Sequence, residues 1–228
     1  MLLLLSVVPF FPSCTGEAPV VDSVRYYTIA SYNPQSGERN EALSIFLNVS
    51  HEDGEQQLSE WRVSHEESQL HWEQHANSWE QRVWDERSWI GSSSLRAPDR
   101  EELPRGRYSV KVVDRGGRES VTQFELRTLD FTLADATFPR MIPAESSEHE
   151  GERWTVEHGG DRLVATVISQ QGEVLWRQEP DDGVLRLDDL EISEDGDSVA
   201  EQDSAAAVYL HELRERSEVW LVSGPWAL

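Results

Sequence analysis

Cysteine and basic residues are scarce in this chain of 228 residues. It contains one cysteine, so no disulfide bond can form within it, and 20 Lys and Arg against 43 Asp and Glu give a formal net charge of −23. A protein that binds a nucleic-acid backbone needs a basic surface, and an anionic membrane surface repels an acidic one. The composition therefore argues against nucleic acid as a partner and against electrostatic attachment to membranes.

The common signatures of catalysis are also missing. The sequence has no phosphate-cradling GxxxxGK[ST], no dinucleotide-binding GxGxxG and no nucleophile elbow. Carboxylates are abundant, but a catalytic pair of carboxylates cannot be assigned without geometry. We therefore expect a protein that is not an enzyme and has no cofactor.

Residues 1–13 are an apolar stretch at the start of the chain. The stretch is too short to span a bilayer as a helix and is typical of the hydrophobic region of a secretion signal. Cys14 follows directly after Phe11-Pro12-Ser13. This segment resembles the lipobox of bacterial lipoproteins, in which a small residue precedes a cysteine that is acylated and becomes the new N-terminus. Phe11 stands where leucine is usual, and no Lys or Arg precedes the apolar run.

The lipobox resemblance implies a signal peptide over residues 1–13, lipidation at Cys14 and a lipidated linker over residues 14–21. Acyl chains contribute roughly 0.8 kcal/mol per buried methylene, so a diacylated terminus would hold the protein on a lipid bilayer. Thr15, in place of Asp, suits sorting to the outer membrane of a two-membrane bacterium. The expected location is the cell envelope, and the chain resembles the poorly characterised lipoproteins of such bacteria, spirochaetes among them.

Short segments with period-two alternation dominate from residue 22 onward, separated by clusters of Gly, Pro, Asn and Asp. This pattern is typical of β-sandwiches and barrels. Gly116 and Gly117 can adopt positive φ and predict a hairpin between strands near residues 107–113 and 119–127. One segment departs from the pattern, because capping-box spacing at Ser78 predicts a short helix near residues 79–87.

Tyr108 and Trp61 carry a second resemblance. The segment around Leu103-Pro104-Arg105-Gly106-Arg107-Tyr108 resembles the tyrosine corner of immunoglobulin-like and fibronectin type III sandwiches, and Trp61 would fill the core position on their third strand. The resemblance implies an all-β chain, with an immunoglobulin-like β-sandwich over residues 22–128. A connection over residues 129–144 would lead to a second, smaller β-sandwich-like module over residues 145–228. The absence of paired cysteines excludes the disulfide-bonded antibody version.

Two groups of side chains could hold a metal ion. On a strand, His71, Glu73 and His75 would share one face and present two imidazoles and a carboxylate, although the spacing is not that of HExxH. The alternative is a solvated strand face. The acidic tract from Asp181 to Asp203 has part of the ligand pattern of a calcium-binding EF-hand loop, and the alternative is a plain acidic loop.

Four tryptophans, Trp72, Trp79, Trp84 and Trp89, could stack on sugar rings or fill a core that is short of Leu and Ile. A flat exposed row of indoles would favour a carbohydrate-binding module, whereas buried indoles would favour a plain scaffold. The sequence thus predicts a membrane-anchored envelope lipoprotein that acts as a non-catalytic binding or structural module. Its partner would be an unknown envelope protein or a glycan.

Overall fold

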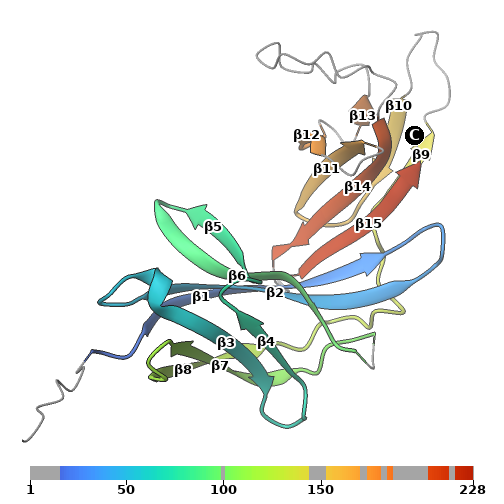
Figure 1. Cartoon of the computed structure of the whole chain (residues 1–228). Helices are drawn as coiled ribbons and strands as arrows, with labels where there is room; N and C mark the ends of the chain where they lie inside the picture. Colours follow the sequence, from blue (N-terminus) through green and yellow to red (C-terminus); the bar gives the residue numbers. More distant parts are fainter. Residues whose placement is uncertain are drawn as a thin grey trace, which may run out of the picture.

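The all-β prediction is confirmed by the computed structural model (Figure 1). The structure describes residues 16–98, 101–143, 153–169, 174–180, 184–186, 205–215 and 219–227. These residues form fifteen β-strands and one short 3-10 turn, and they contain no α-helix. The strands are β1 (Val20–Tyr32), β2 (Arg39–Ser50), β3 (Leu58–His65), β4 (His71–His75), β5 (Glu80–Trp84), β6 (Arg87–Arg96), β7 (Gly106–Asp114), β8 (Glu119–Leu126), β9 (Arg140–Pro143), β10 (Arg153–Glu157), β11 (Arg162–Ser169), β12 (Val174–Gln178), β13 (Val184–Arg186), β14 (Ala205–Arg214) and β15 (Val219–Ala227).

The first eight strands make a sandwich of two antiparallel layers. Strands β1-β2-β6-β5 form one layer, and strands β4-β3-β7-β8 form the other. This is the arrangement of strands A-B-E-D and C′-C-F-G in immunoglobulin-like sandwiches. The β-sandwich predicted for the first half of the chain is therefore present.

The core of the first sandwich follows from alternation along its strands. Leu43, Ile45 and Leu47 on β2 point inward and meet Trp61 of β3. Trp61 is fully buried, as the resemblance implied. The tyrosine corner is also confirmed, because the hydroxyl of Tyr108 donates a 2.7 Å hydrogen bond to the backbone carbonyl of Pro104.

The remaining strands make a second, smaller sandwich with the same connectivity. Strands β13-β10-β9 form a three-stranded sheet, and β12-β11-β14-β15 are consecutive strands of the largest sheet. Their order matches A-B-E and C′-C-F-G, so the two halves repeat one topology without a visible sequence repeat. Its buried core consists of Met141, Val156, Leu163, Ala165, Val167, Val208 and Leu210.

One continuous sheet joins the two sandwiches. The end of β1 pairs in parallel with the start of β15, from Thr28 opposite Val219 to Tyr32 opposite Ser223. The large sheet therefore has eight strands, in the order β12-β11-β14-β15-β1-β2-β6-β5. In Figure 1 this sheet runs from the first sandwich into the second, and the second sandwich is set at an angle to the first.

The predicted connection packs against one face of this junction. Leu133, Ala136 and Phe138 form a buried cluster with Ala30 of β1 and with Val219 and Leu221 of β15. This cluster is separate from the cores of both sandwiches. The connecting segment therefore supports the parallel strand pair from one face.

The helix predicted near residues 79–87 is wrong. These residues form β5 and the turn into β6, and Trp84 pairs with Arg87 across a two-residue turn. Asp85 and Glu86 both have positive φ, as a type I′ hairpin requires. Ser78 does not cap a helix, since its hydroxyl bonds the backbone carbonyl of His75 and accepts the His75 N–H in a local turn.

Strands β6 and β9 were not predicted. The segment Gly91–Ser94 of β6 has weak β-propensity, but its glycine is required where β6 approaches β2. A Cβ at Gly91 would lie 2.0 Å from the carbonyl oxygen of Ile45. Most of the acidic tract at 181–203, and residues 1–15 with Cys14, lie outside the described residues.

Candidate functional site

The structure brings together part of the predicted histidine site. Glu73 and His75 on β4 lie beside Glu60 of β3, and one ligand atom from each falls within 4.8 Å of the others. The distances are 3.4 Å between His75 Nε2 and Glu73 Oε1, and 3.9 Å between His75 Nδ1 and Glu60 Oε2. His71, also predicted, lies on the same exposed face of β4 but is not part of this group.

Arg62 already forms ion pairs with both carboxylates of this group. Nε of Arg62 donates a hydrogen bond to Oε2 of Glu73 at 3.0 Å, and Nη2 of Arg62 donates a second hydrogen bond to the same oxygen. These hydrogen bonds are the main reason that the pKa of Glu73 lies below its ordinary value. Because Glu73 is already paired with a fixed cation, this exposed cluster is an ion-pair network, and no metal site is assigned to it.

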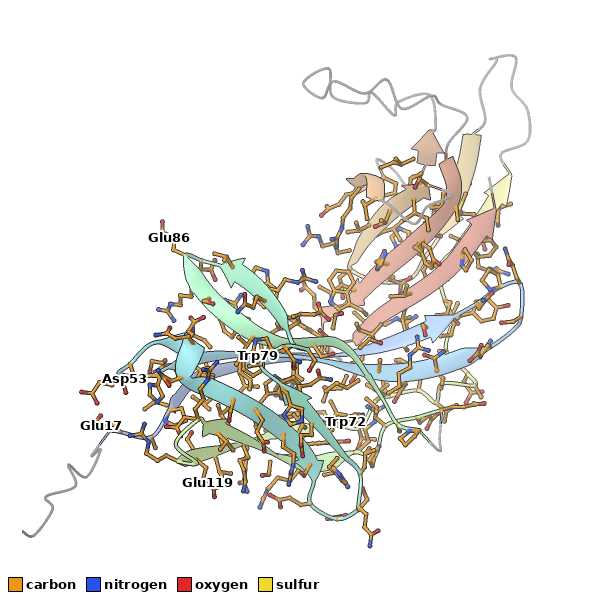
Figure 2. The ribbon with its side chains drawn as sticks, viewed as in Figure 1. Glu17, Asp53, Trp72, Trp79, Glu86 and Glu119 are labelled. Atoms are coloured by element: carbon orange, nitrogen blue, oxygen red, sulfur yellow. The ribbon has the colours of Figure 1, made fainter. Side chains whose placement is uncertain are left out.

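Two of the four candidate tryptophans, Trp72 and Trp79, pack against the first core. The indole N–H of Trp72 donates a 2.8 Å hydrogen bond to the carbonyl of Arg96, and its ring stacks over Tyr108 at a centroid distance of 6.4 Å. Figure 2 shows both indoles within the body of the first sandwich, whereas Asp53, Glu86 and Glu119 point outward. Both indoles are therefore partly covered by the first sandwich.

The other two tryptophans lie on the opposite face of the eight-stranded sheet. Trp89 is 2% exposed, and half-buried Trp84 contacts Phe46 edge-on at 4.9 Å. The guanidinium of Arg25 covers both rings, 4.6 Å from the centroid of Trp89 and 5.7 Å from that of Trp84. All four indoles have packing contacts within the first sandwich, which favours a scaffold over a flat exposed row of sugar-stacking rings.

A buried carboxylate, Asp114, fixes the turn between β7 and β8. Its oxygens accept hydrogen bonds from the backbone N–H and Nε of Arg118, at 2.9 and 2.7 Å, and from Nε2 of His51 at 3.2 Å. Burial alone would raise the pKa of Asp114. These hydrogen bonds lower the pKa by more than burial raises it, so that it is about 2. The side chains of His51 and Asp114 are inaccessible to solvent, so the pair has a structural role.

A hollow of about 420 Å³ lies between the connection and the loop before β7. Buried Glu41 accepts hydrogen bonds there from the N–H of Leu103 at 2.9 Å and from Arg105 at 2.6 Å. Burial raises the pKa of Glu41, and Arg105 only partly offsets that shift. Further acidic side chains, Glu102, Asp130 and Asp135, line the hollow. Its polar contacts hold loops together.

A second hollow among the described residues is a groove at the junction of the two sandwiches. It has a volume of about 190 Å³ and is lined by Tyr27, Ile29, Ser44, Arg177, His211, Trp220 and Val222. These residues come from β1, β2, β12, β14 and β15. We call this feature the junction groove, and it exists because β15 pairs with β1.

The junction groove combines an apolar floor with a few polar groups, as small-ligand sites generally do. His211 lies beside Arg177, and burial together with the nearby positive charge lowers the pKa of His211 to about 4. His211 is therefore neutral near pH 7. Arg177 is exposed.

Sequence reasoning did not identify the junction groove. Its residues lie on five separate strands, and each reads as an ordinary position of an alternating strand. No local spacing connects β1 with β15, since a parallel pair has no hairpin to mark it. The scarcity of histidine was the one available signal, and it pointed to β4 instead.

Comparisons with known proteins give little further information. No family model matches the chain, and no curated protein matches its sequence. Among solved structures, one described as "Biofilm associated protein - BSP domain" is similar over 88% of this chain, with 12% identity and a TM-score of 0.25. The match spans 28% of that chain. Within the described residues, no helix is long and apolar enough to cross a bilayer.

Proposed function

We propose that this protein is an envelope lipoprotein, anchored in a lipid bilayer through acylated Cys14. Its exported part would act as a non-catalytic structural and binding module that holds a partner, an envelope protein or a glycan, away from the membrane. The N-terminal sequence supports the anchor, and the two joined sandwiches support the role as a spacer. The proposal includes no cofactor and no catalysis.

The observation that carries the spacer role is the parallel pairing of β1 with β15. Strand β1 begins six residues after Cys14, and it pairs directly with β15, the last strand of the described residues. A pull between the anchor and a partner on the second sandwich would load these strands along their length. Several backbone hydrogen bonds would then have to break together, which makes the junction stiff.

The position of Gly16 indicates which end of the first sandwich the proposed anchor would lie near. A Cβ at Gly16 would lie 1.9 Å from Nη1 of Arg118, so the chain enters the sandwich at the β7–β8 turn. Glu17, Asp53 and Glu119 project around the same end (Figure 2). Anionic headgroups would repel these carboxylates, so attachment would depend on the acyl chains.

The proposed absence of catalysis is supported by the state of the described polar groups. The one buried His–Asp pair is sealed from solvent, and the exposed His–Glu group is neutralised by Arg62. The junction groove holds a histidine but lacks a hydroxyl or thiol bonded to it among the described side chains. One hydroxyl does contact a histidine, because Ser68 Oγ lies 2.9 Å from Nδ1 of buried His65. The other ring nitrogen of His65 is bonded to the backbone carbonyl of Arg105 at 3.0 Å, so we interpret this pair as a link between loops of the first sandwich.

Labelling with a palmitate analogue in a diderm bacterial host tests the anchor. The wild-type chain is expected to incorporate the label and to fractionate with membranes, whereas Cys14→Ala is expected to lose both properties. Ser13→Ala, which keeps a small residue before the cysteine, is the matched control and should still be labelled. Label retained by Cys14→Ala, or mature protein that keeps residues 1–13, would contradict the proposal.

A further inference from the structure

We propose that the junction groove binds a small aromatic carboxylate, with the ring on its apolar floor and the carboxylate on Arg177. This inference goes beyond the anchored-spacer function and does not depend on it, because every residue of the groove lies in the described sandwiches. The argument rests on the position of the groove, its size and its charge.

The groove lies on the face of the eight-stranded sheet that turns away from the sandwich cores. Ala30 and Leu221 point to the buried cluster on one face, so their neighbours Ile29 and Trp220 point to the other. Ile29 and Trp220 are paired residues of β1 and β15. The floor is therefore built by the strand pair that joins the two sandwiches.

The floor offers contacts suited to one aromatic ring. Ile29, Val222 and the indole of Trp220 are its apolar groups, and Tyr27, which is 41% exposed, adds a second aromatic side chain. A cavity of roughly 150 Å³ is large enough to hold benzene, so about 190 Å³ accommodates one ring with a short acidic substituent. A larger ligand would extend into solvent.

Charge selects the substituent. The chain carries 43 acidic residues, yet no described carboxylate lines the groove, whereas Arg177 does. Among the described residues Arg177 has no ion-pair or hydrogen-bond partner, unlike Arg62 and Arg118. A guanidinium is well suited to a carboxylate, because its N–H groups match both carboxylate oxygens. Ser44 and His211 supply neutral polar edges.

The hollow beside the connection provides a contrast. Its lining includes Glu41, Glu102, Asp130 and Asp135, and its one arginine, Arg105, already pairs with Glu41. An anionic ligand would be repelled there. The two cavities therefore have opposite preferences, and the junction groove is the one that fits an anion.

Titration with phenylacetate tests the inference, using the ¹⁵N-labelled full chain near physiological ionic strength so that the net charge is screened. We expect a saturable shift of the NMR signal from the indole N–H of Trp220. This signal is assigned by its absence from the spectrum of Trp220→Phe. Phenylacetamide, the neutral isostere, should bind at least about tenfold more weakly, the factor expected for losing a charged hydrogen bond.

Two variants locate the carboxylate contact. Arg177→Gln should weaken phenylacetate binding about tenfold or more, while Arg140→Gln, the same change at an exposed arginine of β9, should leave it unaltered. Val222→Glu should abolish binding by placing a carboxylate in the groove, and circular dichroism would confirm that it folds.

Three results would overturn the inference. They are equal affinity for phenylacetamide, equal losses in Arg177→Gln and Arg140→Gln, and the absence of a saturable Trp220 shift up to the solubility of phenylacetate. None of these results concerns Cys14 or the membrane. Failure of this inference and failure of the anchored-spacer proposal are therefore distinguishable.

Discussion

Asp114 is a buried carboxylate that stays ionised because the β7–β8 turn surrounds it with donors. His51 Nδ1 accepts the backbone N–H of Asp53 at 3.1 Å, so its proton lies on Nε2 and is directed at Asp114. The pKa of Asp114 is lowered from its ordinary 3.8 to about 2. The stabilisation is therefore complete above about pH 4 and is lost as the pH falls from there towards 2.

Asp114→Asn should reveal this contribution. At pH 7 we expect the variant to be less stable by about 1–3 kcal/mol, because an amide cannot accept all the hydrogen bonds of a carboxylate. The difference should shrink towards pH 2, where the wild-type carboxyl becomes protonated. Urea unfolding at both pH values measures it, and a difference that is the same at pH 7 and pH 2 would contradict the ionised-carboxylate account.

The tyrosine corner gives a second prediction at single-residue scale. Tyr108→Phe removes the hydroxyl that bonds Pro104 and leaves the ring stacked on Phe124. We expect a loss of about 1 kcal/mol in the free energy of unfolding. Tyr27→Phe, at an exposed tyrosine, should change that free energy by less than about 0.5 kcal/mol. Equal effects of the two variants would show that the corner bond contributes nothing.

Among elements, the β5–β6 hairpin shows how a local signal can mislead. Ser78 and Gln81 have the spacing of a helix cap. In the hairpin, however, Trp84 packs on Phe46, Trp89 packs on Trp84, and Arg25 covers both indoles. Burial of two indoles outweighs the small free energy of a helix cap. Tertiary packing therefore decided the structure of this segment.

Glu86→Gly should stabilise the hairpin. Glu86 has φ of 61°, a conformation that costs a residue with a Cβ roughly 1 kcal/mol and glycine nothing. The resulting Asp-Gly pair suits a type I′ turn, and Asp85 keeps its 2.7 Å ion pair with Arg25. Thermal melting should rise by a few degrees. Gln81→Gly, in the strand itself, should lower it, and a fall in both variants would contradict the assigned turn.

At the scale of the whole molecule, the junction between the sandwiches depends on the buried cluster around Leu221. Leu221→Ala should cost about 2–5 kcal/mol through lost burial and a cavity. We expect calorimetry to show one unfolding transition for the wild type and two for Leu221→Ala. The reason is that the substitution weakens the contact between the two sandwiches, so that they unfold separately. Val83→Ala, at a site 76% exposed, serves as the control. A single transition in Leu221→Ala, with unchanged melting temperature, would mean that the junction adds no stability.

The net charge of −23 gives the last prediction. Self-repulsion among surface carboxylates destabilises a compact chain, and salt screens such repulsion over about 10 Å at 0.1 M. The melting temperature should therefore rise with added sodium chloride, most steeply at low concentration. A melting temperature that stays flat from low to molar salt would indicate that ion pairs such as Arg62–Glu73 already balance the acidic surface.

The sequence by itself determined the all-β class, most strands, the glycine turn after Asp114, and the burial of Trp61 and Tyr108. Each of these depends on alternation or on residues close together in the chain, where local sterics and burial dominate. Only the tertiary structure decided that β1 pairs with β15, because their residues are roughly 190 positions apart and a parallel pair leaves no turn signal between them. The junction groove and the hairpin at 80–96 follow from such long-range packing, which no short segment encodes.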